Sequence, residues 1–159
     1  MKKFVIQATV LVTIIITALA LYTSRIHLPI STSQNQPIKE ISIGSVKLKA
    51  EVADTAEKRK LGLGDREFLA SDSGMLFIFP EAKKYTFWMK GVKFPLDFIW
   101  IKDKLVIDIT KNVPIPNIGQ EDQNLPIYRP KEPIDSVLEL NAGFADTYEI
   151  KVGDKIKIE

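Results

Sequence analysis

The sequence of 159 residues contains no cysteine and a single histidine, His27. The absence of cysteine excludes disulfides, thiolate nucleophiles, iron–sulfur clusters and zinc sites built from thiolates. Beyond His27 the chain has no imidazole. Ser-His-Asp and Cys-His mechanisms and histidine-ligated metals are therefore excluded from the rest of the chain. We expect neither a cofactor nor a metal site.

The chain also lacks a strong excess of one charge, with 22 Lys and Arg against 20 Asp and Glu. Four of these bases and one acid lie in residues 1–40, which leaves 18 basic and 19 acidic residues in residues 41–159. A nucleic-acid-binding protein needs a basic face that displaces counterions from phosphates. The near-neutral balance gives no indication of such a face, and we expect no nucleic-acid partner.

One long apolar segment is present, Phe4–Tyr22, and it has no charged residue. As a helix it would be about 28 Å long at ~1.5 Å per residue, close to the ~30 Å hydrocarbon core of a membrane. Lys2 and Lys3 precede it. The positive-inside rule then places the rest of the chain on the extracytoplasmic side. We expect Phe4–Tyr22 to anchor the protein in the membrane.

A cleaved signal peptide is the alternative, because Ala18-Leu19-Ala20 fits the small-x-small pattern of signal peptidase sites. The protein would then be secreted or periplasmic. The apolar run is longer than the roughly 7–15 residues of the apolar core of a typical signal peptide, which favours the anchor. Residues 23–40 are rich in Ser, Thr, Gln, Asn and Pro, and this composition predicts a flexible linker.

Residues 41–159 are predicted to form one mostly β domain (α+β), a small barrel-like antiparallel or mixed sheet with one or two short helices. Alternating apolar residues predict two strands in residues 41–52, joined at Gly44-Ser45. The next segment resembles a capping box with Asp54 as the cap. It predicts a short helix that Gly62 and Gly64 end.

Further strands are expected at residues 75–79, 137–140 and 156–158, and residues 96–101 and 105–109 are expected to form a hairpin. Residues 85–89 are rich in β-formers. Residues 142–148 favour a helical turn. Five prolines stiffen a long loop over residues 110–135, and loops of this length usually have a role.

Four segments, taken in their order and spacing, resemble the DUF192 (UPF0127) family of small, often exported proteins. They are EKRKLGL at 57–63 with Arg66, GMLFIF at 74–79, FWMK at 87–90 with PLD at 95–97, and VLELNAG at 137–143 with Gly153-Asp154. The resemblance covers residues 41–159 and implies a compact β-barrel-like fold and export. The family's biochemical function is unassigned. This chain has Gly64 where the family commonly has Met, and Gly91-Val92 where it commonly has Asn-Thr.

Six residues are the candidates for a ligand-binding site: Trp88, Lys90, Asp97, Glu139, Arg59 and Arg66. Asp97 and Glu139 each interrupt an apolar run, where a carboxylate needs a hydrogen-bond donor or a positive charge. A structural interpretation is the alternative. Each acid would then point to solvent or pair with one of the arginines, and Trp88 would be a core residue.

We prefer a non-enzymatic envelope module that binds a ligand, such as a saccharide, or another envelope protein. Trp88 would stack on the ligand and the carboxylates would bind its hydroxyls. The alternative is a carboxylate-dependent hydrolase acting on envelope saccharide, with the carboxyl groups of Asp97 and Glu139 roughly 5–10 Å apart. A purely structural role is the third hypothesis.

Overall fold

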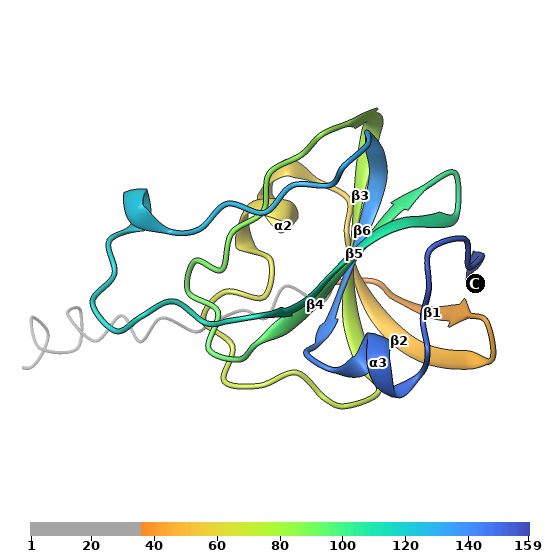
Figure 1. The fold of residues 1–159 in the computed structure, drawn as a ribbon, viewed down its shortest axis with the longest axis horizontal. Helices are drawn as coiled ribbons and strands as arrows, with labels where there is room; N and C mark the ends of the chain where they lie inside the picture. The colour runs from red at the N-terminus through yellow and green to blue at the C-terminus, as the bar shows by residue number, and fades with distance from the viewer. Residues whose placement is uncertain (1–35) are drawn as a thin grey trace, which may run out of the picture. The chain divides into compact units, whose positions relative to one another are not determined.

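The computed structural model describes residues 36–159, so Phe4–Tyr22 and most of the predicted linker lie outside the described residues. Seven strands form one sheet (Figure 1). They are β1 (Ile38–Ile43), β2 (Val46–Ala53), β3 (Ser73–Lys83), β4 (Leu96–Lys102), β5 (Leu105–Val113), β6 (Ile134–Asn141) and β7 (Ile156–Ile158). The helices are α2 (Ala56–Leu61), α3 (Phe144–Thr147) and the 3₁₀ turn η1 (Asp122–Asn124).

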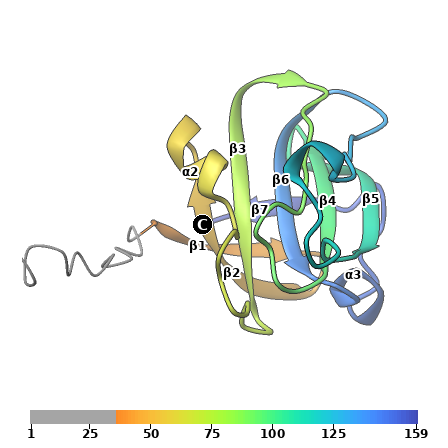
Figure 2. The same ribbon diagram turned by 90° about the vertical axis from the view of Figure 1, so that its left-hand side faces the viewer.

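The strand order is β5-β4-β6-β3-β2-β1-β7. Only the β2–β3 pair is parallel, and it needs the crossover that α2 and residues 62–72 provide. The sheet curls until its two edges approach, as Figure 2 shows. Leu105, at the start of β5, forms a bridge with Lys155, just before β7. The predicted mostly β fold with short helices is confirmed, as a mixed sheet curled into a half-barrel.

Local turn chemistry explains the two hairpins. Gly44 has a φ of +59° between β1 and β2, a conformation that costs glycine little. Between β4 and β5, Asp103 and Lys104 have φ values of 50° and 62°. Two central residues with positive φ match the right-handed twist of a two-residue hairpin. The predicted hairpin is confirmed, and both of its strands extend beyond the predicted ends.

Two local predictions need correction. Strand β1 begins at Ile38, earlier than the predicted domain start at residue 41, because its residues pair with β2 from Ile38 onward. The N-cap of α2 is Thr55, whose side chain accepts a hydrogen bond from the backbone N–H of Lys58 at 3.3 Å. Asp54 instead forms an ion pair with the Lys58 ammonium at 2.7 Å.

Residues 85–89 form no regular strand in the described chain. They make a single bridge, in which Phe87 and Tyr128 exchange two backbone hydrogen bonds of 2.9 Å. Phe87 and Met89 are buried against one face of the sheet. This segment therefore covers the sheet rather than extending it.

The two faces of the sheet build two cores. The inner core lies within the curl and draws on every strand, with Leu76, Ile99, Ile101, Leu138, Leu140 and Ile156 among its members. The outer core covers β3, β4 and β6, and includes Met75, Phe77, Phe87, Phe98, Trp100 and Val137. Because strand side chains alternate between faces, neighbouring residues of one strand belong to different cores.

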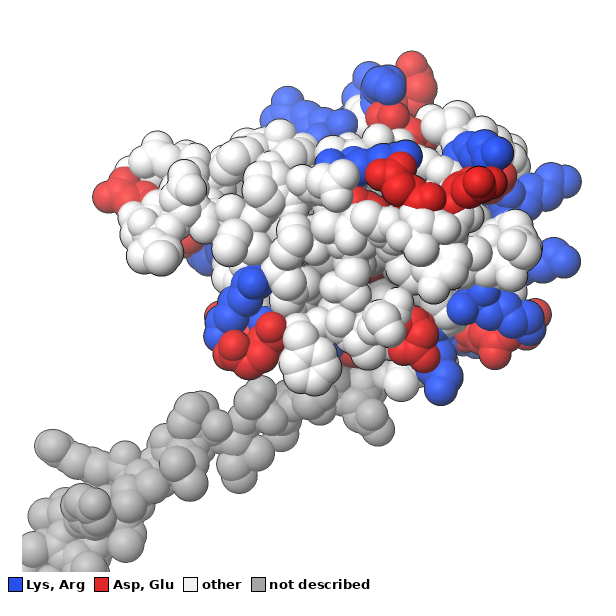
Figure 3. Space-filling model, turned by 60° about the horizontal axis from the view of Figure 1, so that its bottom comes forward, with Lys and Arg blue, Asp and Glu red and all other residues white. Residues whose placement is uncertain are grey.

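Charged side chains of both signs are interspersed on the face drawn in Figure 3. Several form ion pairs at the surface, including Lys47 with Glu40 at 2.7 Å and Lys111 with Asp146 at 2.5 Å. Such exposed pairs contribute only about 0–1 kcal/mol each to stability.

Candidate functional site

A pocket with a volume of about 190 Å³ lies over the outer face of the sheet. Its walls come from α2 and the turn after it, from β3, and from the covering segment 85–90, and β6 reaches it through Glu139. The lining residues are Arg59, Lys60, Leu61, Gly62, Leu63, Gly64, Phe77, Phe79, Tyr85, Thr86, Phe87, Trp88, Lys90 and Glu139. Four of the six predicted site residues meet here.

Glu139 forms the base of the pocket. It pairs with Met75 of β3 and Phe98 of β4, so its side chain lies between two apolar, fully buried neighbours. The residue is 5 % exposed, and no hydrogen bond or ion pair reaches its carboxyl group from residues 36–159. Burial without a compensating charge raises the pKa of Glu139 to about 8. The carboxyl is therefore uncharged at neutral pH and able to donate a hydrogen bond.

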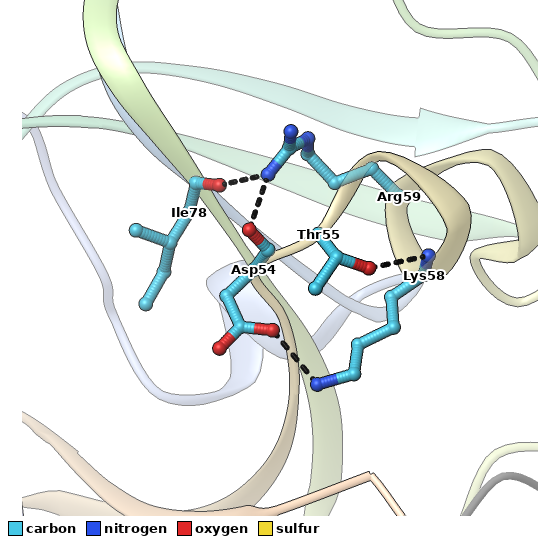
Figure 4. Close-up of polar contacts among 5 residues, drawn as sticks. All are labelled: Asp54, Thr55, Lys58, Arg59 and Ile78. Atoms are coloured by element: carbon cyan, nitrogen blue, oxygen red, sulfur yellow. Dashed lines mark hydrogen bonds and ion pairs between the residues drawn. The ribbon is translucent and has the colours of Figure 1, made fainter.

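Arg59 is fixed at the side of the pocket by backbone contacts. Its Nη1 donates to the carbonyl oxygens of Asp54 at 2.8 Å and Ile78 at 2.7 Å, which ties α2 to β3. Figure 4 shows the other two guanidinium nitrogens directed away from both carbonyls. Within residues 36–159 no hydrogen bond occupies these two nitrogens, so their donors are available to a ligand.

The aromatic rings of the pocket have different roles. The Phe79 ring lies between two partners, with the Arg59 guanidinium 5.2 Å from its centroid and the Tyr85 ring stacked at 3.7 Å. Phe77 and Phe87 meet edge to face at 5.2 Å. A ligand therefore cannot stack on Phe79 without displacing a partner. Phe77 and Phe87 are buried, so among these aromatic side chains the exposed ring left to a ligand is that of Trp88.

Trp88 and Lys90 lie at the mouth. The Trp88 side chain is 56 % exposed, so the alternative that placed it in the core is wrong. The core tryptophan is Trp100, which is fully buried and donates to the Thr110 hydroxyl at 2.9 Å. Lys90 forms an ion pair with Asp122, which holds the long loop beside the mouth.

A protein-family model described as uncharacterized ACR, DUF192, matches residues 39–158. The chain belongs to the DUF192 family. Two crystal structures have a similar fold, each with a TM-score of 0.70. One, named as a candidate transcription regulator from Sinorhizobium meliloti 1021, is 29 % identical, and the match covers 77 % of this chain and 95 % of that chain. The other, a protein of unknown function from Novosphingobium aromaticivorans DSM 12444, is 28 % identical, with coverage of 81 % and 89 %. No curated protein matches this chain.

Asp97 lies outside the pocket of this DUF192 domain. It is fully buried, and its carboxylate accepts hydrogen bonds from the backbone N–H groups of Asn112 at 2.8 Å and Ala145 at 2.9 Å. Ala145 is in the first turn of α3, and Asn112 has a φ of 54° near the end of β5. Asp97 therefore satisfies two backbone donors and pairs with neither arginine, contrary to the structural alternative.

The carboxyl groups of Asp97 and Glu139 face opposite sides of the DUF192 sheet. Asp97 is opposite Leu140 in the β4–β6 register, and Phe98 is opposite Glu139. Leu140 belongs to the inner core and Phe98 to the outer core. The hypothesis of a two-carboxylate hydrolase fails on this geometry, because both groups must flank one bond in one cleft.

Arg66 is also outside the pocket. Its Nη1 and Nη2 bind the two carboxylate oxygens of Glu51, with the Nη2–Oε2 distance at 2.8 Å. The pair joins the segment after α2 to β2 and is half-buried. The hydrogen bonds that Arg66 donates to the Glu51 carboxylate raise the pKa of its guanidinium. Arg66 therefore braces the fold instead of contacting a ligand.

The sequence reasoning missed the aromatic wall of the DUF192 pocket and the turn that borders it. Phe77 and Phe79 lie two residues apart on β3, and Tyr85 and Phe87 have the same spacing. Residues at that spacing face the same side of an extended segment. Two such aromatic pairs close in the sequence were the signal that could have indicated a shared apolar surface.

Within residues 36–159, no group of three or more acidic or histidine side chains has a metal-binding arrangement. The described part of the chain also contains no helix long and apolar enough to cross a membrane.

Proposed function

We propose that this DUF192 domain is a non-enzymatic binding module that holds a small ligand in the pocket above Glu139. One observation carries the proposal: Glu139 is 5 % exposed, its carboxyl group has no partner in the described chain, and it lines an open pocket. A buried polar group without a hydrogen bond costs about 1–3 kcal/mol in stability. Such a cost is common where the group is kept for a ligand.

The surroundings of Glu139 favour binding over catalysis. General acid–base catalysis on a glycosidic bond uses two carboxyl groups, and this pocket is lined by one. Residues 36–159 contain no histidine or cysteine that could act as a nucleophile or proton shuttle. The free donors of Arg59, the exposed face of Trp88 and the neutral Glu139 are instead groups that orient a bound molecule.

We also propose that the module works on the extracytoplasmic side of a membrane, anchored by Phe4–Tyr22, and that its ligand comes from the cell envelope. The support is the uncharged 19-residue stretch preceded by two lysines. The structural relative from S. meliloti is named for transcription regulation. The balance of charges in residues 41–159 does not favour a nucleic-acid ligand here.

Tryptophan fluorescence of the full chain tests the proposal, because the two tryptophans differ in exposure. We expect an envelope saccharide or an envelope extract that contains the ligand to change the emission of Trp88 and to leave that of buried Trp100 unchanged. The Trp88→Phe variant serves as the matched control and should lose the response. The proposal fails if none of these ligands changes the emission or raises the melting temperature.

Protein binding at the long loop is a second candidate, favoured by its exposed apolar side chains. Ile115, Ile118 and Ile127 are 48 %, 107 % and 56 % exposed. A pull-down from solubilised envelopes tests it. Ile118→Ser should reduce capture of a specific partner while Trp88→Phe leaves it unchanged, and equal capture by both variants would count against this surface.

A further inference from the structure

The base and the mouth of the pocket differ in charge. At the base, Met75 and Phe98 flank Glu139, and desolvation is the single cause that raises the pKa of its carboxyl. No hydrogen bond or ion pair within residues 36–159 joins Arg59, Lys60 or Lys90 to this carboxyl. The inner end of a ligand therefore meets an uncharged carboxyl group, which can donate one hydrogen bond and accept another.

The mouth carries positive charge. Arg59 and Lys60 contribute it from α2, and Lys90 contributes it from the covering segment. Lys90 is balanced by Asp122, whereas Arg59 contacts only carbonyl oxygens and the Phe79 ring within the described chain. Glu139 is the one carboxyl side chain among the lining residues, and its burial raises its pKa to about 8. The lining itself therefore carries net positive charge, and the carboxylates of Asp54 and Glu57, which interact electrostatically with Arg59, are not among the lining residues.

The middle of the pocket suits one ring. Phe77 and Phe87, both buried, and the exposed Trp88 are among its lining residues. A cavity of about 150 Å³ lined by apolar side chains holds benzene. The pocket volume of about 190 Å³ is sufficient for one ring and a short substituent.

We propose that the pocket binds a small organic anion with a single ring, whose anionic group lies among Arg59, Lys60 and Lys90 and whose uncharged end lies at Glu139. The inference rests on the proposed function and adds the chemical class and the orientation of the ligand.

Three probes with the same phenol ring and different ends test this class. They are 4-hydroxyphenylacetate, which is an anion, 4-hydroxyphenethyl alcohol, which is neutral, and tyramine, which is a cation. Their affinities are measured by isothermal titration calorimetry at pH 6.5 on the full chain in lipid nanodiscs, with empty nanodiscs as the blank. We expect the anion to bind about tenfold more tightly than the alcohol, and tyramine to bind most weakly. Added salt should reduce the difference.

Variants assign the orientation. Lys60→Gln should reduce the preference for the anion over the alcohol, and Lys157→Gln on β7 is the matched control, because it removes the same charge from outside the pocket. Arg59→Gln should abolish the preference, and a thermal melt shows whether α2 remains docked in that variant. Glu139→Leu should reduce the affinity for all three probes by a similar factor, because it removes the hydrogen bond to the phenol group that they share.

The proposal is overturned if the alcohol or tyramine binds as tightly as the anion, or if the Lys60 and Lys157 variants behave alike. It is also overturned if none of the three probes binds. The proposed function has its own test. It fails if the envelope ligands of the fluorescence experiment change neither the emission of Trp88 nor the melting temperature.

Discussion

Asp97 and Glu139 lie on the paired strands β4 and β6, yet their carboxyl groups point to opposite faces of the sheet. On the inner side, Asp97 accepts two backbone hydrogen bonds. On the outer side, Glu139 has no partner in the described chain and borders the pocket. Two acids in similar apolar runs therefore have different roles, one structural and one available to a ligand.

The Asp97→Ala variant should be destabilised by about 2–4 kcal/mol, because it leaves two buried backbone N–H groups without an acceptor. Urea denaturation measures this loss. The control is Asp122→Asn, which removes the same charge at the surface and should cost less than about 1 kcal/mol. Equal stability of the two variants would mean that Asp97 does not hold α3 and the end of β5.

Glu139 should make stability fall as pH rises. Its pKa is about 8 in the folded chain and 4.5 in the unfolded reference, so the folded state holds the extra proton between these values. The stabilisation is fully present below pH 4.5, is lost between about pH 4.5 and 8, and amounts to roughly 3–5 kcal/mol.

The Glu139→Gln variant removes this titration. Its free energy of unfolding relative to the parent protein should rise from pH 5 to pH 9 and then level off, as measured by urea denaturation at each pH. Other ionisable groups cancel in the difference, since both proteins share them. Parallel pH profiles would show that Glu139 is ionised in the folded state at neutral pH.

Gly74→Ala should separate β3 from β6 on the inner face of the sheet. A Cβ at Gly74 would lie 2.8 Å from the Glu139 carbonyl oxygen and 2.8 Å from a Leu140 methyl carbon, and neither the paired backbone nor the buried side chain has room to move. We expect a loss of about 1–3 kcal/mol in the free energy of unfolding. The neighbouring change Ser73→Ala is the control and should cost much less; equal costs would show that the close approach is not needed.

Trp88→Ala and Trp100→Ala should separate binding from stability. Trp88 is exposed at the mouth, so its loss should change stability by less than about 0.5 kcal/mol and weaken binding of 4-hydroxyphenylacetate. Trp100 is fully buried, so its loss should cost about 3–5 kcal/mol. Thermal melts and calorimetry check both effects. A strongly destabilised Trp88→Ala protein would instead identify Trp88 as a packing residue.

Much of the fold could be predicted because it depends on local patterns. The alternation of apolar residues indicated β1 and β2, the three residues 102–104 indicated the β4–β5 hairpin, and Gly62 marked the end of α2. The N-cap was placed one residue too early, because Asp54 and Thr55 both suit a cap and only the backbone angles distinguish them.

The candidate site was predicted in part. Arg59, Trp88, Lys90 and Glu139 do share one pocket, whereas Asp97 and Arg66 bind partners elsewhere. Arg59 and Arg66 look equivalent along the chain. The tertiary structure gives one of them carbonyl acceptors and the other a carboxylate, because β3 passes beside α2 and β2 passes beside residue 66.

The sequence by itself determined which chemistry is excluded, since the absence of cysteine, and of histidine beyond His27, holds for any fold. It also determined that residues 41–159 are mostly β, because their apolar residues alternate along the strands. Only the tertiary structure decided which carboxyl group reaches the pocket. The face that a strand residue occupies depends on the register of its partners, and a shift of one residue would exchange the two faces.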